Sequence, residues 1–149
     1  MTGPEEVPAI GAGAEDGVLQ HASCVSCHGR GVLIMGEPGT GKSSLALRLI
    51  DRGAMLVADD YTLLTRAGDA LVATPPRRIA GLIEVRGLGI FRLPFRRNIP
   101  LVLTVRLGRE DERLPEPKEW EMLGVTVPLI VMDALRDDSP PQVEVALRG

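Results

Sequence analysis

Aromatic residues are scarce in this sequence of 149 residues. They make up 3% of it, as one tryptophan, one tyrosine and two phenylalanines. The hydrophobic fraction is 44% and the charged fraction 25%, which are ordinary values for a globular protein. The core must therefore consist mainly of Leu, Val, Ile and Ala. A chain of this length fits one domain with a single core.

Long apolar runs are also missing. No stretch reaches the roughly 18 residues that a membrane span requires. The first six residues, MTGPEE, have neither the basic start nor the apolar stretch of a signal peptide. We therefore expect a cytoplasmic protein that does not associate with membranes. The net charge of −3 argues against nucleic acid as a major partner.

Large apolar side chains are too few in residues 1–16 to offset the entropy lost on ordering. This segment instead combines prolines, glycines and acidic residues. We therefore expect a mobile N-terminal tail over residues 1–16, followed by one domain over residues 17–149.

Cysteine is represented by two residues, Cys24 and Cys27, which form a C-x-x-C-H string with His28. This string is typical of c-type haem attachment, but that chemistry requires export, for which no signal is present. A zinc site that adds His21 would draw all four ligands from eight residues, whereas structural zinc sites usually use two separated pairs. A disulfide is disfavoured in a reducing compartment. Two partly buried cysteines on a strand are the simplest interpretation.

The most informative stretch covers residues 36–43, GEPGTGKS, which satisfies the pattern G-x-x-x-x-G-K-[ST] in full. Residues 31–35 before it are apolar and predict a buried strand, and residues 43–50 after it predict a short helix. A glycine-rich loop between a strand and a helix N-terminus is typical of phosphate binding, because backbone N–H groups turn toward the anion. The residues expected to contact the nucleotide are Gly36, Glu37, Pro38, Gly39, Thr40, Gly41, Lys42, Ser43 and Ser44.

Two side chains of this loop have distinct expected roles. Lys42 should reach the β and γ phosphates of a nucleotide, and the hydroxyl of Ser43 should bind a magnesium ion. The sequence therefore predicts ATP and Mg²⁺ as cofactors.

The remaining pattern predicts more strands than helices, in an α/β domain. A strand is expected from Val18 to Val25, a second buried strand at residues 54–58, and a hairpin whose turn lies at residues 66–69. Further strands are expected at residues 79–85, 90–93, 101–107 and 125–131. Residues 112–123 contain two prolines and several charges and predict a surface excursion, with Trp120 covering the core edge. Near the end, Ser139 is expected to cap a short helix.

Two acidic residues, Asp59 and Asp60, follow the apolar strand at residues 54–58. An acid at this place in a phosphate-loop enzyme can hold magnesium. Because successive side chains of an extended chain point to opposite sides, one carboxylate can face the metal and the other an acceptor hydroxyl. The alternative interpretation is a solvated turn pair.

A third stretch, residues 84–90 (EVRGLGI), places Glu84 and Arg86 among apolar residues and then gives two closely spaced glycines. The glycines suggest that the backbone passes near a bulky or charged group. The alternative is a surface ion pair beside a bulge. Nearby arginines at positions 77, 78, 92, 96 and 97 are either a solvated face or contacts for phosphates or an acidic partner.

Together, His21 and residues 36–43, 56–60 and 84–90 resemble the catalytic domain of HPr kinase/phosphorylase. The resemblance covers most of residues 17–107, and the chain is similar to the short alphaproteobacterial form that lacks the family's N-terminal domain. It implies a phosphate-loop core related to phosphoenolpyruvate carboxykinase, with a mixed, strand-rich sheet. It also implies ATP-dependent phosphorylation of a serine of the phosphocarrier protein HPr, the phosphorolysis of phosphoserine-HPr, and a homo-oligomer.

The resemblance also assigns residues. Lys42 corresponds to the family's phosphate-binding lysine and Ser43 to its metal-binding hydroxyl. Asp59 corresponds to the aspartate that acts as base in the kinase direction and as acid in the reverse direction. Asp60 and Glu84 correspond to acids around the metal and phosphates. His21 corresponds to a histidine at the start of the strand before the loop, and we expect it to be a catalytic residue.

This sequence also departs from the family pattern. The loop after residues 87–90 is cut down to residues 91–97, and the C-terminal arginine and long helices are reduced to Arg136 and a short tail. Two further hypotheses therefore stand beside an HPr kinase. One is a nucleotide-binding sensor or interaction module without transfer activity, and the other is a kinase for a different acceptor.

Overall fold

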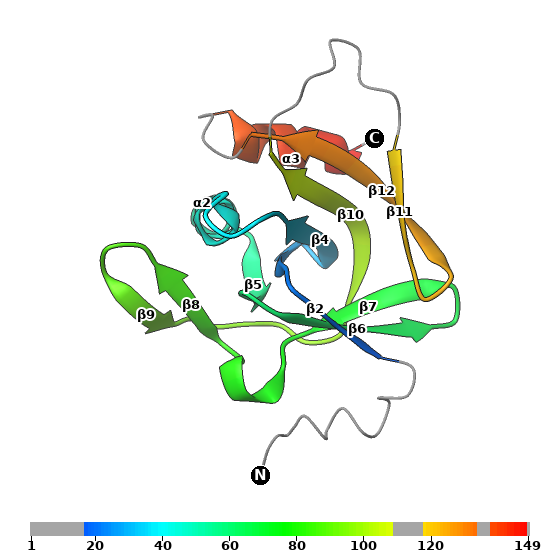
Figure 1. Ribbon diagram of the computed structural model, residues 1–149, viewed down its shortest axis with the longest axis horizontal. Helices are drawn as coiled ribbons and strands as arrows, with labels where there is room; N and C mark the ends of the chain where they lie inside the picture. Colours follow the sequence, from blue (N-terminus) through cyan, green and yellow to red (C-terminus); the bar gives the residue numbers. More distant parts are fainter. Residues whose placement is uncertain (1–16, 109–117, 134–137, 149) are drawn as a thin grey trace.

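The computed structural model describes residues 17–108, 118–133 and 138–148, so the expected tail at residues 1–16 and Arg136 lie outside the described residues. Two α-helices, a 3₁₀ turn and eleven strands make up this part of the chain (Figure 1). The helices are α2 (Lys42–Asp51) and α3 (Ser139–Arg148), and the 3₁₀ turn is η1 (Arg77–Ile79). The strands are β2 (Val18–Gln20), β3 (Ser23–Cys27), β4 (Arg30–Met35), β5 (Met55–Ala58), β6 (Thr62–Ala67), β7 (Ala70–Thr74), β8 (Leu82–Val85), β9 (Gly89–Arg92), β10 (Ile99–Leu107), β11 (Lys118–Met122) and β12 (Val125–Met132).

Nine of these strands form one mixed sheet, and β8 and β9 form a separate hairpin. The long strand β10 joins the parts of the sheet. Its first residues, Ile99 and Pro100, pair antiparallel with β7, whereas its later residues pair parallel with both β4 and β12. The expected strand-rich mixed sheet with few helices is therefore confirmed.

After the exposed Arg30, the strand β4 is apolar and buried up to Met35, because it is covered on both faces. Val32 and Ile34 belong to one cluster of buried side chains, together with residues of α2 and α3. Leu33 and Met35 belong to a second cluster, to which β6, β7 and β12 contribute. Alternate residues of one strand thus support two cores on opposite faces of the sheet.

One edge of the sheet brings together segments that are far apart in the sequence. The strands β4 and β5 both run antiparallel to β3, so their carboxyl ends lie beside the amino end of β3. Ser23 pairs with Ile34 near the end of β4, and Cys24 pairs with Ala58 at the end of β5. The loop after β4, the acidic pair after β5 and Ser23 therefore meet at this edge.

Several local predictions are corrected by the structure. The expected strand from Val18 to Val25 is two strands, β2 and β3, which pair with different neighbours and are separated at His21. The expected strand at residues 79–85 begins only at Leu82, because Arg77–Ile79 forms the turn η1. The predicted helix after residues 31–35 and the hairpin of β6 and β7 are confirmed.

The C-terminal part contains two further differences. Lys118–Met122 is not an excursion but the strand β11, which pairs with β12; Trp120 packs against the second core cluster, as expected. The helix α3 begins at Ser139 as expected, but the Ser139 hydroxyl does not cap it. That hydroxyl donates to the carbonyl of Asp133 at 2.6 Å, and the carbonyl of Asp138 accepts the bond from the Gln142 N–H at 3.0 Å.

The described helices can be compared with the requirements for a membrane span. In the described part of the chain, no helix has both the length and the apolar character needed to cross a bilayer.

Candidate active site

The glycine-rich loop between β4 and α2 has a conformation that requires its glycines. Gly39 and Gly41 adopt φ angles of +85° and +99°, in the left-handed region that side chains disfavour. A Cβ atom on Gly36 would lie 2.5 Å from the Thr40 hydroxyl oxygen. That hydroxyl in turn donates to the carbonyl of Glu37 at 2.7 Å. The first glycine of the pattern is therefore needed for close packing, and the later two for the turn itself.

Lys42 is the first residue of α2 and its side chain folds back over this loop. The residue is buried, and its ammonium donates to the carbonyls of Gly36 at 2.9 Å and Glu37 at 3.4 Å. The first N–H groups of a helix have no partners within the helix and carry the positive end of its dipole. The helix start and the lysine charge thus give this end of α2 the character of an anion-binding site.

Asp59 is buried, with 5% of its surface exposed, and its carboxylate is surrounded by donors. One oxygen accepts bonds from the hydroxyls of Ser23 at 2.8 Å and Ser43 at 2.7 Å. The other accepts the backbone N–H of Glu84 at 3.0 Å. Asp59 therefore ties together the start of β3, the start of α2 and the strand β8, and it orients the Ser43 hydroxyl.

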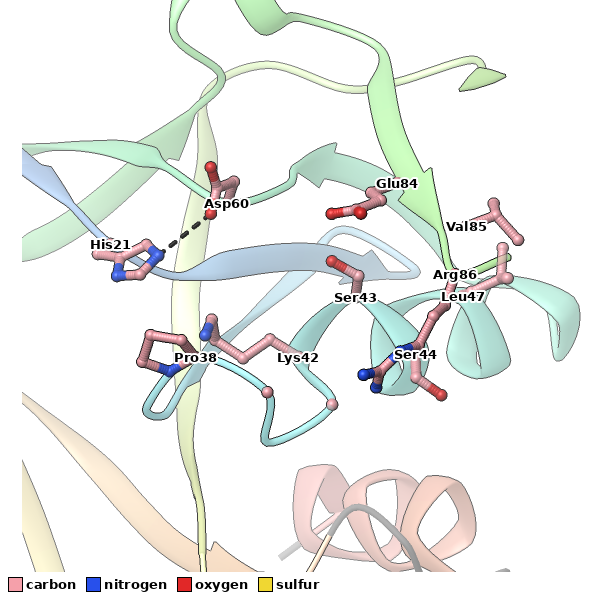
Figure 2. Close-up of a pocket in the computed structure, with 12 residues that line it drawn as sticks. His21, Pro38, Lys42, Ser43, Ser44, Leu47, Asp60, Glu84, Val85 and Arg86 are labelled. Atoms are coloured by element: carbon pink, nitrogen blue, oxygen red, sulfur yellow. Dashed lines mark hydrogen bonds and ion pairs between the residues drawn. The ribbon is translucent and has the colours of Figure 1, made fainter. Parts of the chain in front are cut away.

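Asp60, in contrast, has an exposed carboxylate, because the backbone turns at this residue. Its φ of +71° is in the left-handed region, and its exposed carboxylate pairs with Nε2 of His21 at 3.1 Å (Figure 2). The ring of Tyr61 stacks on His21, with centroids 4.9 Å apart. Asp60 and His21 thus form an accessible carboxylate–imidazole pair facing Lys42.

A cavity of about 510 Å³ lies between these groups (Figure 2). Its walls come from the glycine-rich loop, the first turns of α2, the His21–Asp60 pair and β8. Lining it are His21, Pro38, Gly39, Gly41, Lys42, Ser43, Ser44, Leu47, Asp60, Glu84, Val85 and Arg86. The structure thereby brings together most of the residues that the sequence predicts. The predicted residues that do not line the cavity are Gly36, Glu37, Thr40 and Asp59.

Arg86 is a site residue that sequence reasoning did not assign. It lines the cavity, so its guanidinium borders the same space as the ammonium of Lys42. The signal was present, since Arg86 is the basic residue of the stretch at residues 84–90. Its placement follows from the hairpin of β8 and β9, in which it begins the connecting loop.

Glu84 lines the cavity as predicted, but the two glycines after it have a different role from the one expected. Gly87 and Gly89 have φ angles of +85° and +116°, and no atom lies within 4 Å of a Cβ built on either. They serve the turn between β8 and β9 rather than the close approach of another group. The structure also records no ion pair between Glu84 and Arg86, so that alternative is not supported.

The three residues predicted to bind magnesium, Ser43, Asp60 and Glu84, line the same cavity. Among the described residues, no group of three or more His, Cys, Asp or Glu side chains is arranged to hold a metal ion. Asp60 pairs with His21, whereas Ser43 and Glu84 face the cavity from α2 and β8. A serine hydroxyl and one carboxylate suit Mg²⁺, which usually keeps water and phosphate oxygens as its other ligands.

The two cysteines do not form a common site. Cys24 packs in the second core cluster and Cys27 against the first, on opposite faces of β3. Burial raises the pKa of both thiols above the ordinary value, and each is a free cysteine. Side chains on opposite faces of one strand cannot share a zinc ion or form a disulfide with each other. The expected pair of structural cysteines on a strand is confirmed.

Comparison with known proteins agrees with this architecture. The family model described as the HPr serine kinase C-terminal domain matches residues 15–134. Among curated proteins, the HPr kinase/phosphorylase of Cupriavidus metallidurans is 40% identical over 146 residues, which cover 89% of this chain and 45% of that protein. The HPr kinase/phosphorylase of Caldicellulosiruptor bescii is 37% identical over 129 residues, which cover 77% of this chain and 42% of that protein. The chain thus spans less than half the length of these two relatives.

A solved structure is also similar. The HPr(Ser) kinase/phosphatase from Coxiella burnetii superposes with a TM-score of 0.76 and 29% sequence identity, and the match covers 88% of each chain.

Proposed function

The chain belongs to the family of the HPr serine kinase C-terminal domain, and from this premise we propose that it is an ATP-dependent protein serine kinase that phosphorylates HPr. The names of its relatives support this activity. One observation carries the proposal: Lys42, Ser43 and Asp60 line the same cavity at the start of α2. Because the chain spans less than half of those relatives, the activity is assigned to it here as a proposal.

The glycine-rich loop is the proposed phosphate-binding loop, in a core related to phosphoenolpyruvate carboxykinase. Backbone N–H groups of the loop and the ammonium of Lys42 would hold the β and γ phosphates of ATP. Ser43 and Glu84 would hold a magnesium ion, which neutralises phosphate charge when bound. Arg86 adds a second positive charge to the lining of the cavity.

For the two aspartates we propose roles that differ from those the resemblance assigned. A general base must reach the acceptor hydroxyl, and Asp60 lines the cavity, whereas Asp59 is buried and accepts three hydrogen bonds. Asp60 is therefore the proposed base, and His21 fixes its carboxylate. Asp59 is the proposed positioning residue for the Ser43 hydroxyl.

These groups account for every bond and proton that changes in the transfer step. The serine oxygen of the acceptor attacks the γ phosphorus of ATP, its proton passes to Asp60, and the bond from the γ phosphorus to the bridging oxygen breaks to release ADP. Lys42 and Arg86 stabilise charge on the phosphoryl oxygens. Run in reverse, with phosphate as the attacking group, the same arrangement would phosphorolyse phosphoserine-HPr and give pyrophosphate. We propose that the protein acts in the cytoplasm. We also propose that it assembles into a homo-oligomer, as the family resemblance implies.

The test is phosphate transfer from labelled ATP, with magnesium, to the HPr of the same organism. We expect labelled serine with the parent chain and a loss of roughly 10²–10⁴-fold in turnover for Asp60→Asn, because general base catalysis contributes that much. The nucleotide affinity of Asp60→Asn should stay close to that of the parent. Lys42→Ala and Asp59→Asn should lose nucleotide affinity as well, since one removes the charge and the other releases Ser43.

Asp69→Asn is the matched control, because Asp69 is a fully exposed aspartate in the turn after β6. If Asp59→Asn lost turnover but kept nucleotide affinity while Asp60→Asn stayed active, the proposed division of roles would be wrong. If the parent bound ATP but left HPr unlabelled, the HPr kinase activity would be excluded. The chain would then be a nucleotide sensor, or a kinase for another acceptor.

A further inference from the structure

The β8–β9 hairpin exposes large apolar side chains beside the cavity. Leu88 is 73% exposed, Ile90 69% and Phe91 43%, and all four residues of β9 are exposed. Figure 1 shows the hairpin projecting from the molecule next to α2. A cluster of exposed apolar residues on one element is characteristic of an interaction surface.

The register of the hairpin shows which side chains share the cavity side. Glu84 lies opposite Ile90, and Leu82 lies opposite Arg92. Residues directly opposite in an antiparallel pair project from the same face, and so do residues two apart on one strand. Because Glu84 lines the cavity, Ile90 and Arg92 lie on the face of the hairpin that borders it.

The base of the hairpin is fixed to the core. Ile83 is 1% exposed and belongs to the first core cluster. The backbone N–H of Leu93 donates to the carbonyl of Gly81 at 2.7 Å, and the N–H of Glu84 donates to the buried Asp59. The exposed tip is thus held at a defined position relative to the cavity.

The segment around the hairpin is strongly basic although the whole chain is acidic. Residues 75–98 contain one acidic residue, Glu84, and six exposed arginines, in a chain with a net charge of −3. The arginines are Arg77, Arg78, Arg86, Arg92, Arg96 and Arg97. A surface with apolar residues and a basic surround complements a partner that has apolar residues and an acidic surround.

From these observations we propose that the tip and the cavity-facing side of the β8–β9 hairpin form the docking surface for the protein acceptor, with Leu88 at the tip and Ile90 and Arg92 on that side. The proposal rests on the proposed kinase function. A serine on a folded protein can reach Asp60 only if the body of that protein lies over the rim of the cavity, and the hairpin forms part of that rim. The fitting partner presents apolar side chains next to its acceptor serine and carboxylates further out.

The test compares Leu88→Ser, Ile90→Ser and Arg92→Glu with the parent chain, using purified HPr as the probe. Two quantities are measured: transfer kinetics at saturating ATP, and the Kd of fluorescently labelled HPr in the presence of ADP. We expect each variant to raise both the KM for HPr and the Kd by about tenfold or more, which is the effect of changing a hot-spot side chain at the centre of an interface. The kcat at saturating HPr and the affinity for ATP should stay within about twofold of the parent, because these side chains do not hold phosphates.

The charge contribution has its own readout. Raising the salt concentration should weaken HPr binding to the parent more than binding to Arg92→Glu, and Arg92→Lys should restore most of the affinity. Val145→Ser is the matched control, since Val145 is 60% exposed on α3 and lies outside the hairpin. Circular dichroism confirms that each variant is folded.

The outcomes separate the two proposals. If HPr is phosphorylated but its KM and Kd are unchanged in the hairpin variants, the docking proposal is overturned and the kinase function stands. If HPr binds in a hairpin-dependent way without being phosphorylated, docking stands and the kinase function fails. If HPr neither binds nor is phosphorylated, both fail. If the variants instead lower the molecular mass measured by light scattering and leave HPr binding intact, the hairpin is a contact between copies of this chain and the docking proposal is overturned.

Discussion

Asp59 and Asp60 are neighbours in the chain but occupy different chemical environments. Asp59 continues the direction of β5 into the core edge and accepts three hydrogen bonds there. Asp60 takes a left-handed φ of +71°, which turns its carboxylate toward His21 and the cavity. A single backbone rotation thus separates a buried carboxylate that orients other groups from an exposed one that lines the cavity.

Gly36 provides a prediction at the residue scale. In Gly36→Ala, the new Cβ would lie 2.5 Å from the Thr40 hydroxyl oxygen and 3.2 Å from the Cβ of Leu107, so the loop must shift. We expect the affinity for ATP with magnesium to fall by about tenfold or more, because the loop N–H groups leave their positions. Isothermal titration calorimetry measures this affinity.

Gly108→Ala is the control for this substitution. Gly108 follows β10, and nothing lies within 4 Å of a Cβ built on it. Its φ is not in the left-handed region, so alanine fits without strain. Equal nucleotide affinity in Gly36→Ala and the parent would show that the packing of this loop does not govern phosphate binding.

At the residue scale, the sequence predicted those parts of the candidate site whose groups lie close together along the chain. The loop between β4 and α2 was recognised because strand, glycines, lysine and helix follow one another along the chain. Strand alternation predicted that Asp59 and Asp60 face opposite sides, but not which of them faces the cavity. That direction depends on the left-handed backbone at Asp60, which an aspartate permits but does not require.

The helices α2 and α3 are joined at the element scale by one ion pair. Nε and an Nη atom of Arg52, just after α2, donate to the carboxylate of Glu144 on α3, the shortest contact being 2.7 Å. The hydrogen bonds from Arg52 lower the pKa of Glu144 below its ordinary value, and the charges of Arg148 and His28 act in the same direction. The pair fixes α3 against the helix that carries the glycine-rich loop.

This ion pair predicts a pH dependence of stability. Because the pKa of Glu144 is lower in the folded state, the pair stabilises the fold above the unfolded value of about 4.3 and loses that effect as pH falls through the folded value. In Glu144→Gln we expect Tm at pH 7 to fall by about 1–3 °C, a small change because both groups are partly exposed. The difference from the parent should shrink below about pH 4. Differential scanning calorimetry across this range measures it, and a difference that stays constant down to pH 3 would contradict the assignment.

The strand β11 shows how an element can be missed although its signal is present. Trp120 and Met122 point toward the second core cluster, whereas Glu119 and Glu121, which alternate with them, are exposed. This alternation is the period of a half-buried strand. The two-residue turn at Leu123 and Gly124, both with positive φ, matches a short hairpin. A strand at the edge of a sheet needs only one apolar face, so its other face can carry charges. Here the charges and nearby prolines led to the prediction of a surface excursion instead of a strand.

At the scale of the whole molecule, β10 connects parts of the sheet that are otherwise separate. Its first residues pair with β7, and the later ones pair with β4 and β12. The two core clusters lie on opposite faces of the sheet and share β4 and β10 as a common layer. If either core lost its packing, one face of the shared strands β4 and β10 would be exposed to water and the other core would lose support. We therefore expect the described domain to unfold as one unit.

Thr104→Val tests this cooperativity. Thr104 is buried on β10, and its hydroxyl donates to the carbonyl of Pro128 on β12 at 2.8 Å. Removing this bond should lower the free energy of unfolding by about 1 kcal/mol. In urea, the fluorescence of Trp120, which is the single tryptophan, and far-UV circular dichroism should report the same midpoint in the parent and shift together in the variant.

Thr126→Val on β12 is the matched control, because Thr126 is exposed and the substitution should leave the midpoint nearly unchanged. Two separate midpoints for fluorescence and circular dichroism would show that the β11–β12 hairpin unfolds independently. Cooperativity through β10 would then be excluded.

The direction of β3 has a consequence for how the chain tolerates new segments. Since β3 starts at the edge that bears Asp59 and the glycine-rich loop, its far end and the turn at His28 and Gly29 lie at the opposite edge. A Cβ atom on Gly29 would meet nothing within 4 Å, and His28 and Gly29 are both exposed. An epitope, a fluorescent label or a whole inserted domain placed at this turn would therefore lie across the sheet from Asp59 and the glycine-rich loop. That turn is the natural point at which to tether the protein to a surface, or to fuse it to a reporter, without obstructing the cavity.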